Sequence, residues 1–283
     1  MATIAQQLQQ TREQLAPVAG DMAALEARLL AQHAWGVPHE AILRDWDKSV
    51  TEHAAQQLRD VTARRARHEP MSQIMGEKDF WKDTFLVSRD VLTPRADSET
   101  LIEALLRLRP QVDAPFSMLE LGVGSGALLL SSMREYGQAL GVAVDVSPAA
   151  LAVAKQNAMR LGLASRVRFL EGDWCNPLDS SEKFDIVISN PPYIAHVDIA
   201  ALDEDVKGYE PHLALDGGID GLDCYRSIFS TIGSHLNAGA LVLVEVGQGQ
   251  AEDVAALGVR AGLHHTETCN DLACIARIVC FTH

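Results

Sequence analysis

Residues 190–193 form the tetrapeptide Asn-Pro-Pro-Tyr, which directly follows the apolar run 184–189. The run predicts a strand, and the tetrapeptide then lies at the carboxyl edge of a sheet, where open α/β folds bind ligands. The two prolines stiffen the backbone and remove its N–H donors, so that carbonyl groups and the Asn190 amide dominate this position. Such a group is suited to hold a planar nitrogen, either of a nucleic-acid base or of an amide. A rigid turn that only ends the strand is the alternative.

A glycine-rich turn, 122–126, follows a second apolar strand further upstream. Its GxGxG spacing differs from the GxGxxG pattern of dinucleotide-binding proteins, and a single glycine turn is weak evidence. Glycines allow a ligand to approach the backbone closely, and the following helix is expected to present free amide donors. The turn therefore predicts a nucleotide-like cofactor that faces the nitrogen at 190–193.

Two acidic residues follow the next strands. Asp145 ends the run 141–145, where a carboxylate is expected to bond both ribose hydroxyls of a nucleoside. A cap for the helix that begins near Pro148 is the alternative for Asp145. Asp173 and Trp174 follow the run 167–171, where the base of a nucleoside would lie. Asp173 is placed to bond an exocyclic amine and Trp174 to flank the ring, although a tryptophan here is also compatible with plain packing.

Apolar runs and helical patterns alternate from residue 117 onward, as in βαβ units. Strands are expected near residues 117–121, 141–145, 167–171, 184–189, 240–246, 264–269 and 274–281. Helices are expected near 127–136, 148–161, 223–236 and 249–262, with a further helix capped by Asp97 or Ser98. The pattern predicts an α/β fold with a seven-stranded, mostly parallel, doubly wound sheet. The last two strands have no helix between them and are expected to form an antiparallel hairpin.

The first part of the chain has a different pattern. Apolar residues recur at helical spacing over residues 4–67, which predicts a small domain of four or five helices. The pattern stops near Pro70, and residues 80–87 favour a short hairpin. We therefore expect a helical domain at residues 1–75, a hairpin linker at 76–95 and the sheet domain at 96–283.

The composition is that of an ordinary globular protein. Of the 283 residues, 47% are hydrophobic and 22% are charged. No apolar run approaches the roughly 20 residues that a membrane helix needs. Residues 1–7 lack the basic segment and the apolar core of a secretory signal. These features predict a cytoplasmic protein that does not contact a membrane.

The net charge of −14 is unevenly distributed. Residues 1–80 contain 9 basic and 11 acidic side chains, and the remainder contains 15 and 27. Because binding to a nucleic-acid backbone normally requires clustered Lys and Arg, no direct nucleic-acid contact is expected. The basic cluster Arg64, Arg65 and Arg67 is interpreted as a solvated helix face, with a contact to an acidic partner as the alternative.

The cysteines predict neither a disulfide framework nor a metal site. They form an odd set without a CxxC pair, and the ten histidines show no HExxH pattern. We expect reduced cysteines in or beside the core, and no metal. These residues are Cys175, Cys224, Cys269, Cys274 and Cys280.

The strand-end motifs together resemble those of seven-stranded, S-adenosylmethionine-dependent methyltransferases, and Asn-Pro-Pro-Tyr narrows the resemblance to enzymes that act on planar nitrogens. Segments over most of the chain are similar to the protein-glutamine methyltransferases that modify bacterial peptide release factors. Ala96, where that family usually has proline, and Lys207, where it often has arginine, depart from the pattern. The similar segments are Gly76–Trp81, Pro94–Glu99, Glu210–Pro211, Ala214–Asp223 and Asp271–Ala273.

The resemblance implies a Rossmann-like class I methyltransferase fold and a definite set of site residues. S-adenosylmethionine is expected to bind Gly122, Val123, Gly124, Ser125, Gly126, Asp145, Asp173, Trp174 and Asn190. The substrate glutamine is expected to bind Asn190, Pro191, Pro192 and Tyr193, of which Asn190, Pro191 and Tyr193 are the catalytic residues. The hypothesis is that the side-chain carbonyl of Asn190 and the backbone carbonyl of Pro191 accept the two amide hydrogens, while Tyr193 packs on the flat amide.

The resemblance also implies the partner, which is the Gly-Gly-Gln loop of a release factor, with residues 1–80 binding that factor elsewhere. A monomer is expected. Within the same class, alternatives are a glutamine methyltransferase of a large-subunit ribosomal protein and an amino-methyltransferase that acts on a nucleic-acid base. Alternatives from other functional classes are an NAD-dependent oxidoreductase and a cofactor-binding module without catalysis. The acidic charge argues against a nucleic-acid substrate, and no hydride-transfer constellation is evident.

Overall fold

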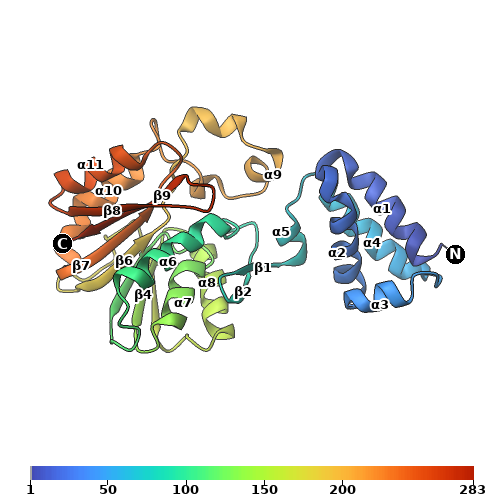
Figure 1. The fold of residues 1–283 in the computed structure, drawn as a ribbon, viewed down its shortest axis with the longest axis horizontal. Coiled ribbons are helices and arrows are strands. Elements are labelled where there is room, and N and C mark those ends of the chain that lie inside the picture. Colours follow the sequence, from blue (N-terminus) through green and yellow to red (C-terminus); the bar gives the residue numbers. More distant parts are fainter. Residues whose placement is uncertain (1) are drawn as a thin grey trace. The chain divides into compact units, whose positions relative to one another are not determined.

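The computed structural model describes residues 2–283 and divides them into two compact units (Figure 1). The first, the helical unit, comprises the chain up to Gly76 together with the segment Asp203–Tyr209. The second, the sheet unit, comprises Glu77–Leu202 and Glu210–His283. The β-hairpin expected before the sheet is present as β1 (Glu77–Phe80) and β2 (Asp83–Leu86), and it belongs to the sheet unit.

The helical unit packs amphipathic helices around an apolar core. A capping box formed by Thr3 and Gln6 begins the first helix, because each side chain bonds the backbone N–H of the other residue. Buried Leu15, Leu30 and Leu58 come from three different helices and pack together. The helices are α1 (Ile4–Ala19), α2 (Ala23–Trp35), α3 (His39–Arg44), α4 (Glu52–Arg65), α5 (Met71–Met75) and α9 (Glu204–Lys207), the last from the later segment.

The interpretation of Arg64, Arg65 and Arg67 as a solvated helix face is wrong for two of the three residues. Arg65 is buried and pairs with Glu26, Nε to Oε2 at 2.8 Å. Arg64 pairs with Glu69, Nη2 to Oε1 at 2.6 Å, and only Arg67 is exposed. The cluster therefore joins α4 to the rest of the helical unit.

The sheet unit is built on a seven-stranded sheet with the strand order β5-β4-β3-β6-β7-β9-β8. All neighbours are parallel except those of β9, which is antiparallel to both β7 and β8, so the predicted α/β fold and its terminal hairpin are confirmed. The strands are β3 (Ser117–Leu121), β4 (Leu140–Asp145), β5 (Val167–Glu171), β6 (Phe184–Ser189), β7 (Leu236–Glu245), β8 (His264–Asn270) and β9 (Ala276–Thr282).

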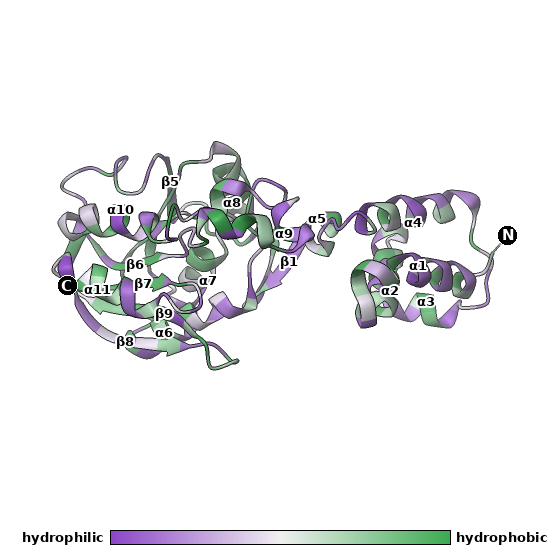
Figure 2. Ribbon diagram, turned by 90° about the horizontal axis from the view of Figure 1, so that it is seen from above, coloured by the Kyte–Doolittle hydropathy of each residue, from purple (hydrophilic) through white to green (hydrophobic). Residues whose placement is uncertain are grey.

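Helices cover both faces of this sheet. The helices α6 (Glu99–Leu108), α7 (Ala127–Glu135) and α8 (Pro148–Arg160) pack in one apolar cluster, and α10 (Asp223–Ile232) and α11 (Ala251–Arg260) in the other. Figure 1 shows the first group in green and the second in orange. The hydropathy colouring of Figure 2 shows apolar residues on the inner strands β6 and β7, which are buried on both sides.

Two local predictions differ from the structure. The strand predicted at 240–246 begins earlier, at Leu236, because Leu236 pairs with Phe184 before a register irregularity. The helix expected to be capped by Asp97 or Ser98 follows a short 3₁₀ helix, Ala96–Ser98, and the Ser98 side chain makes no capping bond. In the described residues, no helix combines the length and the apolar character that crossing a membrane would require.

Candidate active site

A cavity of about 340 Å³ lies at the carboxyl ends of the parallel strands. Of the predicted site residues, it is lined by Gly122, Val123, Gly124, Ser125, Asp145, Asp173, Trp174, Asn190 and Pro192, but not by Gly126, Pro191 or Tyr193. Its lining has five carboxylates but one guanidinium, that of Arg95, which is paired with Glu210 at 2.8 Å. This charge suits a cationic ligand better than an anionic one.

The glycine turn after β3 bonds largely to its own chain. Gly122, Gly124 and Gly126 all have positive φ angles, which glycine adopts without strain. The amide of Gly122 donates to the carbonyl of Val144 at 2.9 Å, and the amide of Gly124 donates to Asp145 Oδ2 at 2.9 Å. The amides of these two glycines therefore bond within the chain, whereas the sequence-based expectation of free donors concerned the helix that follows the turn, α7. A turn with occupied amides suits a ligand without phosphate groups better than a pyrophosphate.

Asp145 is held by the backbone on both sides of its carboxylate. Besides Gly124, the amide of Ser147 donates to its Oδ1 at 2.9 Å. Burial raises the pKa of Asp145, and these backbone N–H groups oppose the rise. Ser147, whose Oγ accepts from Ala150 N at 3.2 Å, is the side-chain cap of α8, so the capping alternative for Asp145 is wrong. Asp145 instead lines the cavity at the end of β4.

Glu120 is a second carboxylate in the cavity lining, and the sequence reasoning did not assign it. It lies in β3 with 2% of its surface exposed, and its Oε2 accepts from Leu129 N at 3.1 Å. Burial raises the pKa of Glu120, and the nearby Asp145 adds to the rise. A charged residue between Leu119 and Leu121 in an apolar strand was the signal that could have identified it.

Asp173 and Trp174 lie where the sequence placed them, beyond the end of β5. Trp174 has a positive φ of 47°, which is uncommon for a bulky residue. Its ring packs on the apolar cluster that includes α10 and α11. The ring also approaches Gly122, since a Cβ added to that glycine would lie 3.9 Å from the indole. The indole is therefore both a packing residue and part of the cavity wall.

The tetrapeptide at 190–193 divides between the cavity and the core. Asn190 is half-buried in the cavity wall, and its Nδ2 donates to Ser98 Oγ at 3.3 Å. Because the amide donor points to Ser98, the carbonyl end of Asn190 is the end left for a ligand. Tyr193 packs against the apolar cluster that includes α10 and α11, and burial raises its pKa to about 12. Its backbone carbonyl accepts from Gln250 Nε2 at 2.9 Å, which secures the chain after the two prolines.

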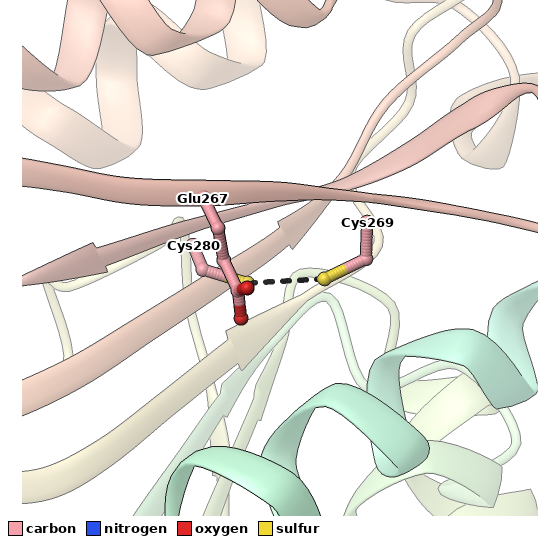
Figure 3. Close-up of side chains that lie close together, drawn as sticks. All are labelled: Glu267, Cys269 and Cys280. Carbon is pink, nitrogen blue, oxygen red and sulfur yellow. Dashed lines mark hydrogen bonds between the residues drawn. The ribbon is translucent and has the colours of Figure 1, made fainter.

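A group of three possible metal ligands lies outside the cavity, on β8 and β9. The ligand atoms of Glu267, Cys269 and Cys280 lie within 4.8 Å of one another, and the two sulfurs are 3.9 Å apart (Figure 3). Arg107 of α6 pairs with Glu267 at 2.6 Å and donates to Cys269 Sγ at 3.3 Å. This guanidinium already balances the carboxylate, so we interpret the group as an ion pair. The expectation that every cysteine lies in or beside the core is wrong for Cys274, which is exposed.

Comparison with known proteins gives the class and then the family. Residues 118–217 match the family described as a methyltransferase domain, and residues 6–76 match the PrmC N-terminal domain. With the seven-stranded sheet and its strand-end cavity, these matches make the protein a class I methyltransferase. The chain is 42% identical to the release factor glutamine methyltransferase of Caulobacter vibrioides over 92% of this chain and 89% of that one. The chain belongs to the release factor glutamine methyltransferase family.

Further relatives agree. The release factor glutamine methyltransferase of Geobacter sulfurreducens is 39% identical, over 98% of this chain and 95% of that one. Among solved structures, the hMettl16 catalytic domain in complex with MAT2A 3'UTR hairpin 6 has a TM-score of 0.56 at 13% identity, covering 78% of this chain and 81% of that one. This second likeness shows the fold alone.

The cavity residues fit S-adenosylmethionine, the cofactor of this class. A nucleoside with a cationic amino-acid tail and no phosphate matches a cavity with several carboxylates and with occupied amides at Gly122 and Gly124. The volume of about 340 Å³ is within the range of small-ligand sites. Because glycine has no side chain, a ligand can approach the backbone of the turn closely at Gly122 and Gly124.

Proposed function

We propose that the protein methylates the side-chain amide nitrogen of the glutamine in the Gly-Gly-Gln motif of peptide chain release factors. Membership of the release factor glutamine methyltransferase family supports this substrate. The observation that carries the proposal is the position of Asn190, an oriented side-chain amide in the wall of a cavity suited to S-adenosylmethionine.

The chemical difficulty is the weak nucleophilicity of an amide nitrogen. Its lone pair is shared with the carbonyl, and the rotation barrier of roughly 18–20 kcal/mol measures that conjugation. The Asn190 side-chain carbonyl and the Pro191 backbone carbonyl accept the two hydrogens of the glutamine amide and thereby orient its nitrogen. Proline fixes the angle between these acceptors. Tyr193, which packs against the apolar core and does not line the cavity, is assigned to holding the chain behind the two prolines.

The cofactor end of the cavity is assigned by chemistry in the same way. Asp145 would bond the ribose hydroxyls, while Asp173 and Trp174 would receive the base. Glu120 lies buried in the cavity wall, where burial and the nearby Asp145 raise its pKa, so we assign it a packing and hydrogen-bonding role rather than a charge. S-adenosylmethionine would supply the methyl group from its sulfonium centre: the S–CH₃ bond breaks as the N–CH₃ bond forms, S-adenosylhomocysteine leaves, and the methylated amide loses one proton to water. The protein then contributes mainly by positioning, for which effective molarities on the order of 10⁵–10⁸ M are known.

The helical unit is assigned to recognition of the release factor outside its Gly-Gly-Gln loop. Residues 6–76 match the family described as the PrmC N-terminal domain. Because translation termination takes place in the cytoplasm, we place the enzyme there, as a monomer. The acidic side chains of residues 81–283, 27 against 15 basic ones, are the reason to expect no direct nucleic-acid contact.

Incubation with radiolabelled S-adenosylmethionine tests the proposal. Release factor, large-subunit ribosomal protein and DNA are supplied separately, each with the full chain. Label is expected in the release factor, and it is expected to disappear when the glutamine of the Gly-Gly-Gln motif is replaced by alanine. Label found only in ribosomal protein or only in DNA would overturn the assignment.

A further inference from the structure

Glu245 is a buried carboxylate that lies beside Asn190 but outside the cavity. It is the last residue of β7. The parallel register of β6 and β7 pairs Ser189 with Val244. Asn190, which follows Ser189, therefore lies beside Glu245, which follows Val244. Only 2% of Glu245 is exposed, and it does not line the cavity. A carboxylate in this position can act on a substrate only through a neighbouring side chain.

The neighbours of the carboxyl group are Ser98 and Asn190. Burial raises the pKa of Glu245 to about 7, and interactions with Ser98 and Asn190 oppose the rise. Among residues 2–283, Glu245 Oε2 has no hydrogen-bond partner. Since a buried, unsatisfied carboxylate oxygen is costly, a group with this environment points to a role other than stability.

Other charged or titratable groups around Glu245 come from four different segments of the chain. Asp97 precedes α6, Arg277 lies in β9, Tyr193 follows β6, and Tyr225 lies in α10. Arg277 is already paired with Asp97 at 3.3 Å and with Asp271 at 2.8 Å. Tyr225 donates its hydroxyl to the backbone carbonyl of Glu245 at 2.7 Å, away from the carboxyl group. None of these four side chains therefore replaces Ser98 and Asn190 as a direct partner of the carboxyl group.

We propose that Glu245 is a positioning residue that fixes the orientation of the Asn190 side-chain amide through Ser98, so that the Asn190 carbonyl faces the substrate glutamine. The ionised carboxylate accepts the Ser98 hydroxyl hydrogen. Ser98 Oγ then has its lone pairs directed toward Asn190 Nδ2, the donor observed at 3.3 Å. This inference rests on the proposed function and adds a residue to its site.

The physical need for such a residue comes from the shape of the amide. The oxygen and nitrogen ends of a side-chain amide have nearly the same size, so packing alone does not distinguish the two orientations. In the wrong orientation, the NH₂ group of Asn190 would face the NH₂ group of the glutamine, and neither could accept. Because a carboxylate only accepts, it selects one orientation, whereas a protonated carboxyl group can also donate to Ser98 and loses the selection.

The test uses the full chain, S-adenosylmethionine and release factor, with the variants Glu245→Gln, Ser98→Ala and Tyr225→Phe. Glu245→Gln and Ser98→Ala are each expected to lower kcat by roughly tenfold to a hundredfold, with little change in KM for the release factor or in affinity for the cofactor. The wild type is expected to gain activity as the pH rises through about 7, the pKa of Glu245. This rise of activity with pH is expected to disappear in Glu245→Gln.

Tyr225→Phe is the matched control, because it removes a hydrogen bond to the same residue through the backbone only. Its kcat and pH profile are expected to remain those of the wild type. The inference is overturned if Glu245→Gln retains wild-type kcat and pH profile, or if Tyr225→Phe loses as much activity, which would show a general structural effect. Absence of release-factor methylation in the wild type would instead overturn the proposed function. Circular dichroism of each variant identifies any loss of folding, and Ser98→Ala still tests the inference should Glu245→Gln fail to fold.

Discussion

Replacement of Asn190 with alanine separates catalysis from stability. In the folded protein the side chain is half-buried, and its observed hydrogen bond is the one to Ser98 at 3.3 Å. Loss of one such bond costs about 1 kcal/mol of unfolding free energy. In the transition state, by contrast, the Asn190 carbonyl is an oriented acceptor for the substrate. Loss of one oriented hydrogen-bonding group of this kind typically lowers kcat by about 10²–10³, or about 3–4 kcal/mol.

The assay combines steady-state methylation of release factor with calorimetric binding of S-adenosylmethionine. Asn190→Ala is expected to lose most of kcat and to bind the cofactor with nearly wild-type affinity, since Asp145, Asp173 and Trp174 remain. Asn190→Asp is the matched control, because it keeps one acceptor oxygen but places a second carboxyl group beside Glu245, so that one of the two is protonated. It is expected to be intermediate. Wild-type turnover by Asn190→Ala would refute the reasoning, as would an equal loss of cofactor affinity.

Three further predictions concern the cofactor site and the fold. Asp145→Ala is expected to weaken S-adenosylmethionine binding by roughly tenfold to a hundredfold in calorimetry, and an unchanged affinity would remove Asp145 from the ribose site. Gly126→Ala places a Cβ 2.9 Å from Leu130 Cδ1 at a φ of +82°, so we expect a loss of about 1–2 kcal/mol in denaturant unfolding, whereas Gly137→Ala, with open space around it, is the neutral control. The carboxyl of Glu245 has a pKa raised from 4.5 to about 7, so its contribution to stability is complete below about pH 4.5 and is lost as the pH rises through 7. Relative to the wild type, Glu245→Gln should therefore gain on the order of 3 kcal/mol between about pH 5 and 8, and a constant difference would contradict the pKa.

The fold could be predicted well because its signals are local. Apolar runs of strand length, separated by helical patterns, define the strands of a doubly wound sheet. The residues that directly follow the parallel strands lie at the carboxyl edge of the sheet, where ligands bind. Asp145, Asp173 and Asn190 therefore lined the cavity as expected. The start of β7 at Leu236 was missed, because the pairing of Leu236 with Phe184 depends on a neighbouring strand and has no signal of its own.

The remaining site residues could not be predicted, because their roles depend on contacts between distant segments. Ser98 has the ordinary signal of a helix cap, yet its hydroxyl accepts from Asn190, 92 positions away. Glu245 ends an apolar strand, and only the sheet register places it beside Asn190. Arg65 has the pattern of a solvated helix face, but its partner Glu26 lies 39 positions away. Burial and pairing of this kind are properties of the tertiary structure.

The most direct test of the account is to map the methylated atom in the release factor by tandem mass spectrometry after incubation with the full chain and S-adenosylmethionine. The account predicts one added methyl group on the side-chain amide of the Gly-Gly-Gln glutamine, with no such product from Asn190→Ala. A methyl group on another residue of the release factor, or an equal yield of the same product from Asn190→Ala, would contradict it.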